Sequence, residues 1–186
     1  MITKILMGVG IIIALLLIVA AIAKKQYVVE RAVTIKKPKS DVFDYIKYLK
    51  NQDQYSKWAT IDPGMKKEYH GTDGTAGFIY AWDSENRDAG KGEQEIRSIT
   101  EGERIDYNLH FIKPFDGRAN ASLITESVSP NETKVTWHFD GKMPYPMNLM
   151  LLFMNMDKAI GKDLETGLAN LKTRLETENF STSKNQ

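Results

Sequence analysis

The chain has 186 residues, with 25 Lys and Arg against 24 Asp and Glu and no Cys, which is enough for one domain with an appendage. The lack of Cys excludes disulfides, thiolate metal sites and a Cys nucleophile. Beyond the first 23 residues, which hold one charge, the other 163 carry 24 basic and 24 acidic side chains, a balance that argues against nucleic-acid binding.

The N-terminus is an uncharged apolar segment. Ile5–Ala23 contains 19 residues, which as a helix would be about 28 Å long, close to the thickness of a bilayer's hydrocarbon layer. We therefore expect residues 1–25 to form a single-pass transmembrane anchor. A cleaved signal peptide is the alternative, because Lys4 precedes the segment and Ala21-Ile22-Ala23 resembles a cleavage site. The segment is longer than the roughly 7 to 15 apolar residues usual in such peptides.

Basic residues are unevenly distributed around this segment. One, Lys4, precedes it, and six follow it closely: Lys24, Lys25, Arg31, Lys36, Lys37 and Lys39. The positive-inside bias therefore predicts a cytoplasmic globular domain whose basic end lies beside anionic head groups. An exported, periplasmic domain is the alternative.

A strand and two short helices are predicted next. Gln26–Ile35 mixes β-branched and aromatic residues and is closed by Pro38, which is typical of a strand. Ser40 is expected to cap a helix, whose apolar face comprises Val42, Phe43, Ile46 and Leu49. A second short helix or turn is expected through Gln52–Trp58.

Six further strands are expected at short spacing. They are Met65–His70, Gly77–Asp83, Gly92–Ile99, Arg104–Ile112, Ala119–Val128 and Lys134–Asp140. Apolar and polar residues alternate in several of them, as in Val135, Trp137 and Phe139 against Thr136 and His138. This alternation predicts an antiparallel sheet of seven strands with one covered face and one face in water.

A long helix is expected to cover the sheet. From Met147 to about Phe180, apolar residues recur at spacings of three and four. Residues 147–156 are apolar nearly all round and are expected to be enclosed on more than one side. Gly161 and Gly167 are expected to mark either a bend or a close approach to the sheet. Residues 181–186 are expected to be a flexible tail.

Three segments resemble the helix-grip proteins of the START-like, polyketide cyclase-like superfamily (SRPBCC). KKPKSDVFDYIKYLKNQDQYSKW (36–58) resembles the entry to the two short helices. GKGEQEIRSITEGERIDYNLHF (90–111) resembles the central hairpin, and residues 133–172 resemble the last strand and long helix of a bacterial branch. The resemblance implies an α+β helix-grip fold, with a curved sheet around the C-terminal helix over residues 26–180. The N-terminal anchor departs from most soluble members.

The resemblance also implies an apolar cavity between the sheet and the long helix. The residues expected to bind a ligand there are Tyr80, Trp82, Gln94, Ile96, Tyr107, Phe111, Trp137, Phe139, Met150, Phe153 and Met154. Aromatic and Met walls suit varied apolar ligands, while Gln94 and Tyr107 are expected to orient a ligand oxygen. For each residue, plain core packing is the alternative.

The sequence offers little support for catalysis. His70, His110 and His138 lack metal-ligand spacing, no nucleophile elbow is present, and Glu93, Glu95 and Arg97 are expected to face water. We therefore predict no catalytic residue, metal or cofactor. The first functional hypothesis is a membrane-anchored module that binds a hydrophobic or lipid-like small molecule. The alternatives are a cyclase- or dehydratase-like enzyme for an aromatic or polyketide-like substrate, and an envelope accessory protein without a ligand.

Overall fold

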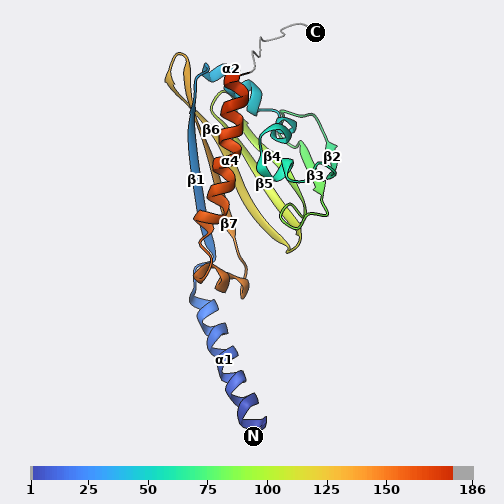
Figure 1. Cartoon of the computed structure of the whole chain (residues 1–186), viewed down its shortest axis with the longest axis vertical. Helices are drawn as coiled ribbons and strands as arrows, with labels where there is room; N and C mark the ends of the chain where they lie inside the picture. Colours follow the sequence, from blue (N-terminus) through green and yellow to red (C-terminus); the bar gives the residue numbers. More distant parts are fainter. Residues whose placement is uncertain (1, 178–186) are drawn as a thin grey trace.

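A curved antiparallel sheet of seven strands forms the frame of the protein (Figure 1). The computed structural model describes residues 2–177. The strands are β1 (Gln26–Ile35), β2 (Lys66–His70), β3 (Ile79–Asp83), β4 (Lys91–Thr100), β5 (Arg104–Lys113), β6 (Gly117–Ser129) and β7 (Glu132–Lys142). Their order across the sheet is β1-β7-β6-β5-β4-β3-β2. The predicted seven-stranded helix-grip fold is confirmed.

Irregular pairing accompanies the bend of the sheet. The register between β4 and β5 shifts at Lys91/Gly92 and again at Ile96/Ser98, and a further shift lies near the β6–β7 turn. Such irregularities increase the local twist and bend of a strand. The concave side carries the inward apolar residues, among them the fully buried Tyr107.

Three short helical segments follow β1. They are α2 (Lys39–Ile46), the 3-10 helix η1 (Leu49–Gln54) and α3 (Lys57–Thr60). The predicted cap at Ser40 is wrong, because α2 begins directly after Pro38 and has no side-chain cap. The Ser40 hydroxyl donates instead to the Asp41 carboxylate at 3.1 Å. Pro38 suits this position, since its fixed φ matches the backbone required there.

The C-terminal helix is interrupted, contrary to the prediction of one helix from Met147. A 3-10 helix, η2 (Met147–Leu152), comes first, and α4 (Met156–Thr177) begins after a short break. Asn155 explains the new start, because its side-chain oxygen accepts a hydrogen bond of 3.0 Å from the backbone N–H of Lys158. The expected helix end near Phe180 and the tail at 181–186 lie outside the described residues.

The segment around η2 is also less enclosed than predicted. Leu152, Phe153 and Met154 are exposed, and within η2 itself Asn148 is the buried residue. The expectation that residues 147–156 are surrounded on several sides is therefore wrong. The helix break directs these apolar side chains away from the core.

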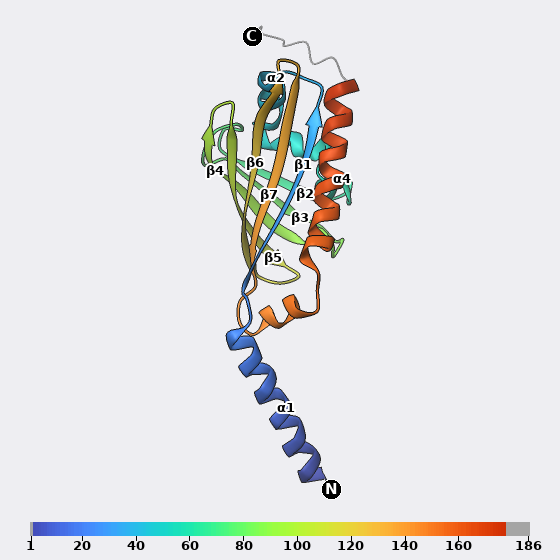
Figure 2. The ribbon, with the colours of Figure 1, turned by 90° about the vertical axis from the view of Figure 1, so that its left-hand side faces the viewer.

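α4 runs along one face of the sheet and packs mainly against β1 (Figure 2). Its buried apolar residues are Leu164, Leu168, Leu171 and Leu175. α4 is continuous through Gly161 and Gly167, and both glycines allow α4 to lie close to the sheet. A Cβ at Gly161 would collide with the Arg31 guanidinium, and one at Gly167 would lie 2.9 Å from the Trp137 ring. Arg31 also pairs with Asp157 at 2.8 Å, which joins β1 to α4.

The N-terminal helix α1 (Ile2–Ile22) extends away from the domain and has η2 at its C-terminal end (Figures 1 and 2). Within residues 2–177 it is the one helix long and apolar enough to cross a membrane. Its side chains are almost all exposed, and Ala20 is the buried exception. α1 therefore contributes nothing to the core of the domain.

Candidate functional site

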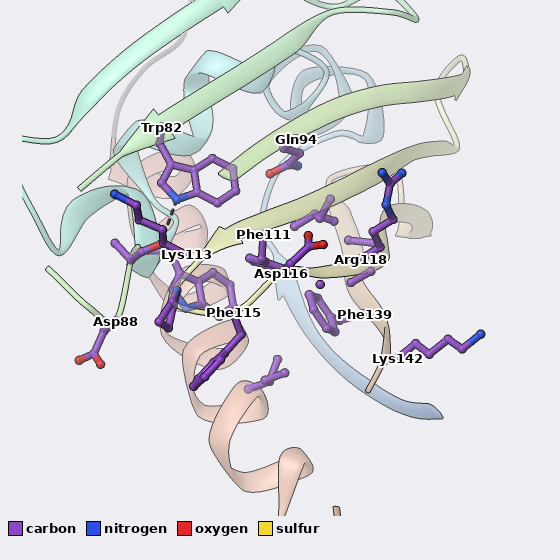
Figure 3. Close-up of a pocket in the computed structure, with 18 of the residues that line it drawn as sticks. Trp82, Asp88, Gln94, Phe111, Lys113, Phe115, Asp116, Arg118, Phe139 and Lys142 are labelled. Atoms are coloured by element: carbon purple, nitrogen blue, oxygen red, sulfur yellow. Dashed lines mark hydrogen bonds between the residues drawn. The ribbon is translucent and has the colours of Figure 1, made fainter. Parts of the chain in front are cut away.

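A cavity of about 350 Å³ lies inside the grip of the sheet (Figure 3). Its walls come from β1, from β3 to β7, from the short helices η1 and α3, from Met147 and Met150 of η2, and from Ile160 of α4. Ala119 and Ala121 project from β6 into this region, whereas Leu123, two residues further along the same face, packs into the filled core. The cavity thus lies where the inward side chains of β6 become small. Its volume falls within the range of small-molecule pockets.

Aromatic rings form much of the cavity wall. The Trp82 ring centroid lies 5.9 Å from that of Tyr80 and 6.3 Å from that of Phe111. Trp58 and Trp137 also line the cavity, with their centroids 6.3 Å apart. All three Trp residues of the chain therefore border the same space. Such rings present broad, rigid apolar surfaces to a ligand.

Trp82 is held in place on both sides. Its indole N–H donates to the carbonyl oxygen of Ala89 at 2.9 Å. Behind the ring lies Gly92, where a Cβ would come within 2.7 Å of the indole and 2.6 Å of the His110 carbonyl oxygen. Only a residue without a side chain leaves room for the ring in this orientation.

A few uncharged polar groups also border the cavity. Gln52 of η1, Ser56 and Gln94 of β4 are all buried and line it. A Gln amide offers both hydrogen-bond donors and acceptors, and a Ser hydroxyl offers both in one group. The wall can therefore bind a ligand that is mostly apolar but carries a polar end.

Two buried Tyr hydroxyls lie near these polar groups. Burial raises the pKa of Tyr80, and the Asp53 carboxylate, which accepts a hydrogen bond of 3.2 Å from its hydroxyl, raises it further. Burial also raises the pKa of Tyr107, an effect that the neighbouring Gln52 side chain partly opposes. Both phenols therefore stay protonated at neutral pH, so they act as hydrogen-bonding groups and not as bases.

The charged residues that line the cavity are all exposed and therefore mark its mouth. They are Arg87 and five residues that Figure 3 labels, Asp88, Lys113, Asp116, Arg118 and Lys142. They come from the β3–β4 loop, the β5–β6 loop and the adjoining strand ends. Four are basic and two acidic, so the mouth has a basic excess. Asp116 is also engaged by the His110 ring at 2.8 Å.

The three His residues lie outside the cavity wall and contact carboxylates. Besides His110, His138 lies 3.2 Å from Glu30, and His70 lies 3.9 Å from Glu68. Among residues 2–177, no three His, Asp or Glu side chains form a group suited to a metal ion. Glu93 and Glu95 lie on the side of β4 opposite the fully buried Ile96, as expected from the sequence.

The structure gathers most of the residues that the sequence proposed as ligand contacts. Seven of them line the cavity: Tyr80, Trp82, Gln94, Phe111, Trp137, Phe139 and Met150. Four do not. Ile96 and Tyr107 are fully buried in the adjoining core, because the cavity does not extend along β4 and β5 as far as these two residues. Phe153 and Met154 are exposed, because the chain leaves η2 before α4 begins.

Sequence reasoning missed several cavity residues. Trp58 and Gln52 come from the short helices, Met147 comes from η2, and Phe115 and Met143 come from irregular segments near the mouth. Strand alternation gives no information about residues in loops and 3-10 helices. A usable signal was present in β6, where Ala119 and Ala121 occupy inward positions that elsewhere hold large residues.

Comparison with known families gives one match. A family model described as "Polyketide cyclase / dehydrase and lipid transport" matches residues 26–176, which is nearly the whole domain after α1. No curated protein sequence matches the chain.

Solved structures of the same fold are numerous. A protein of Nitrosospira multiformis is 16% identical, with a TM-score of 0.57, over 81% of this chain and 97% of that one. A norcoclaurine synthase mutant of Thalictrum, solved with a transition-state analogue, is 7% identical, with a TM-score of 0.57, over 81% of this chain and 96% of the synthase. The di-domain aromatase/cyclase BexL is 13% identical, with a TM-score of 0.60, over 86% of this chain and 53% of BexL. At these identities the likeness concerns the fold alone.

Proposed function

Because the chain belongs to the polyketide cyclase/dehydrase and lipid transport family, we propose that it is a membrane-anchored module that binds a hydrophobic or lipid-like small molecule. The observation that carries the proposal is the cavity of about 350 Å³ with aromatic and Met walls. Burial of apolar ligand surface there contributes about 25 cal/mol per Å².

The wall composition supports a particular class of ligand. Most of the wall is apolar, and Gln52, Ser56 and Gln94 offer uncharged hydrogen-bonding groups. We infer a ligand with an apolar body and one uncharged polar end, such as a hydroxyl, a carbonyl or a protonated carboxyl. A buried ionised group is disfavoured, because no charged side chain of residues 2–177 lines the buried part of the wall.

The proposed location at a membrane rests on α1. Its length and apolar character suit a transmembrane helix, and Lys24 and Lys25 follow it directly. By the positive-inside bias we propose that the domain is cytoplasmic. An exported domain with a cleaved signal sequence is the alternative. N-terminal sequencing of the protein purified from whole cells distinguishes a retained segment from a cleaved one, because cleavage would remove Met1–Ala23.

A cyclase- or dehydratase-like activity is the second candidate, and the family match supports it. Such an enzyme needs a group that moves protons at the reacting atoms. The carboxylates of the wall, Asp88 and Asp116, are exposed at the mouth, and Tyr80 stays protonated because burial raises its pKa. These features favour binding over proton transfer. The third candidate, an accessory protein without a ligand, predicts a filled core, which the cavity argues against.

Native mass spectrometry of the full chain released from lipid nanodiscs tests the proposal. We expect a noncovalent adduct on the wild-type chain and its loss in Ala121→Leu, which projects a larger side chain from β6 into the cavity. Ala81→Leu is the matched control, because Ala81 alternates with the cavity residues Tyr80 and Trp82 and thus lies on the other face of β3. A wild-type chain that is always empty, or an adduct that survives Ala121→Leu unchanged, would contradict the proposal.

A further inference from the structure

An exposed apolar surface surrounds the junction between α1 and the domain. We call it the basal surface and define it by Phe115, Tyr145, Met150, Leu152, Phe153 and Met154, all of them exposed. Phe153 is 83% exposed and Phe115 is 62% exposed. Large apolar side chains gathered in this way mark a contact surface, because soluble monomers rarely expose extended apolar patches. Neither the core nor the cavity wall explains Phe153.

We propose that the basal surface rests in the interfacial layer of the same bilayer that α1 enters, so that the cavity mouth faces lipid. This inference rests on the proposed function, because it takes α1 to be in the membrane. It adds a second membrane contact that fixes the orientation of the domain.

The first argument is the connection between η2 and α1. The Asn148 side-chain amide donates to the carbonyl oxygens of Ala20 at 2.7 Å and of Ala23 at 3.2 Å. The backbone N–H of Met143 donates to the carbonyl oxygen of Lys25 at 2.9 Å. These bonds hold both ends of the Met143–Asn148 segment at the level where α1 ends. A helix that spans a bilayer places its end in the head-group region, so η2 must lie there too.

The second argument is the chemistry of the surface. Apolar and aromatic side chains are surrounded by exposed basic residues, namely Lys24, Lys25, Lys113, Arg118 and Lys142. Elements that lie on membranes combine apolar side chains that enter the acyl boundary with Lys and Arg that meet anionic head groups. A water-soluble partner protein would not need this surface to be continuous with an apolar helix. The bilayer accounts for both features.

The third argument is the position of the cavity mouth. Phe115 and Met150 of the basal surface line the cavity, together with Met147 of η2 and Met143 of the segment that joins β7 to η2. The loop between β5 and β6 lies at the end of the sheet nearer to α1, while the β6–β7 turn lies at the opposite end (Figures 1 and 2). A ligand that leaves the bilayer beside η2 can thus enter the cavity without crossing bulk water.

Site-directed fluorescence on the full chain tests this inference, and the absence of Cys makes it practical. An environment-sensitive nitrobenzoxadiazole label is placed at Phe153→Cys in the basal surface, at Ile13→Cys in α1, or at Val128→Cys, which is 57% exposed near the β6–β7 turn. Each variant is reconstituted in vesicles of phosphatidylcholine and phosphatidylglycerol. The vesicles contain lipids with a nitroxide either near the head group or deep in the acyl chain.

We expect the label at position 153 to show blue-shifted emission and strong quenching by the shallow nitroxide. The label at position 13 should be quenched mainly by the deep nitroxide, and the label at position 128 by neither. A label at 153 that behaves like the one at 128, while position 13 is quenched, would overturn the basal-surface inference and leave the anchor intact. Blue-shifted emission at 153 without quenching would overturn it in favour of a protein partner. An unquenched label at 13 would overturn the anchor as well.

Discussion

The side-chain amide of Asn148 donates a hydrogen bond of 2.7 Å to the backbone carbonyl of Ala20, which lies 128 residues earlier in the chain. Both residues are fully buried, where α1 meets η2. Ala20 is near the end of α1, where carbonyl groups lack partners within the helix. Asn148 therefore makes the joint between α1 and η2 a defined structure and not a free linker.

We predict that Asn148→Leu loosens this joint. It leaves the Ala20 carbonyl unpaired, at a cost of about 1–3 kcal/mol for the local contact. Electron–electron distance measurements between spin labels at Ile11→Cys and Glu30→Cys should show a broader distribution in this variant. Asn170→Leu is the control, because it also removes an amide that donates to a backbone carbonyl, that of Tyr55 at 3.2 Å, but far from α1. Equal widths in the wild type and Asn148→Leu would contradict the prediction.

The basal surface yields a kinetic prediction. Replacing Leu152 and Phe153 by Asp should slow the uptake of a fluorescent fatty acid from vesicles, because the charged side chains are expelled from the lipid interface. Binding of the same fatty acid to protein in detergent should change little, since neither residue lines the cavity. Stopped-flow measurements compare the two rates. Val128→Asp is the control at the far end. Uptake from vesicles at the wild-type rate would refute a role for this surface.

Gly92 should be intolerant of a side chain. A Cβ there would lie 2.6 Å from the His110 carbonyl oxygen and 2.7 Å from the Trp82 ring, so Gly92→Ala must shift the strand or the indole. We expect a loss of about 1–3 kcal/mol in the free energy of unfolding and a changed Trp emission spectrum. Gly117→Ala is the matched control, because a Cβ there has no heavy atom within 4 Å. Similar unfolding midpoints for the two variants would show that the contact is not restrictive.

Asp106 should make the stability of the domain depend on pH. Partial burial raises its pKa, but hydrogen bonds from Ser122, Arg104 and Ser98 outweigh burial, so the pKa falls below its ordinary value. A carboxyl with a lowered folded-state pKa stabilises the fold above its unfolded-state pKa, about 3.9, and this contribution is lost as the pH falls through the folded-state value.

Asp106→Asn should therefore lower the free energy of unfolding at pH 7 by about 1–3 kcal/mol, and the difference from wild type should shrink below about pH 4. Denaturant titrations at several pH values measure both. Glu126→Gln, which removes an exposed pair with Lys134, should change stability by less than about 1 kcal/mol. A constant difference between Asp106→Asn and wild type at all pH values would contradict the assignment.

The sheet was predictable because its strands alternate clearly. In β7 the inward residues Val135, Trp137 and Phe139 are large and apolar, so one face had to be covered. The C-terminal helix was predictable in kind but not in its start. The apolar residues from Met147 onward have a helical period and favour one continuous helix. Asn155 opposes this, because its short polar side chain caps a new helix instead.

The cavity was predictable only where strands supply it. Trp82 and Phe139 follow from alternation, since both lie on the inward face. Phe115 and Met143 lie in irregular segments, whose direction depends on tertiary packing and has no period in the sequence. The prediction for Phe153 is wrong, because the helical pattern of apolar residues predicts that it faces the core, whereas its side chain is exposed.

Intrinsic Trp fluorescence tests the central claim most directly, because all three Trp residues line the cavity. The full chain in nanodiscs is titrated with a fatty acid that carries bromine on its acyl chain, since bromine quenches Trp at short range. The account predicts saturable quenching in the wild type and in Ala81→Leu, and its loss in Ala121→Leu. Quenching that is absent, or that is the same in Ala121→Leu as in the wild type, would contradict an open apolar site between the sheet and η2.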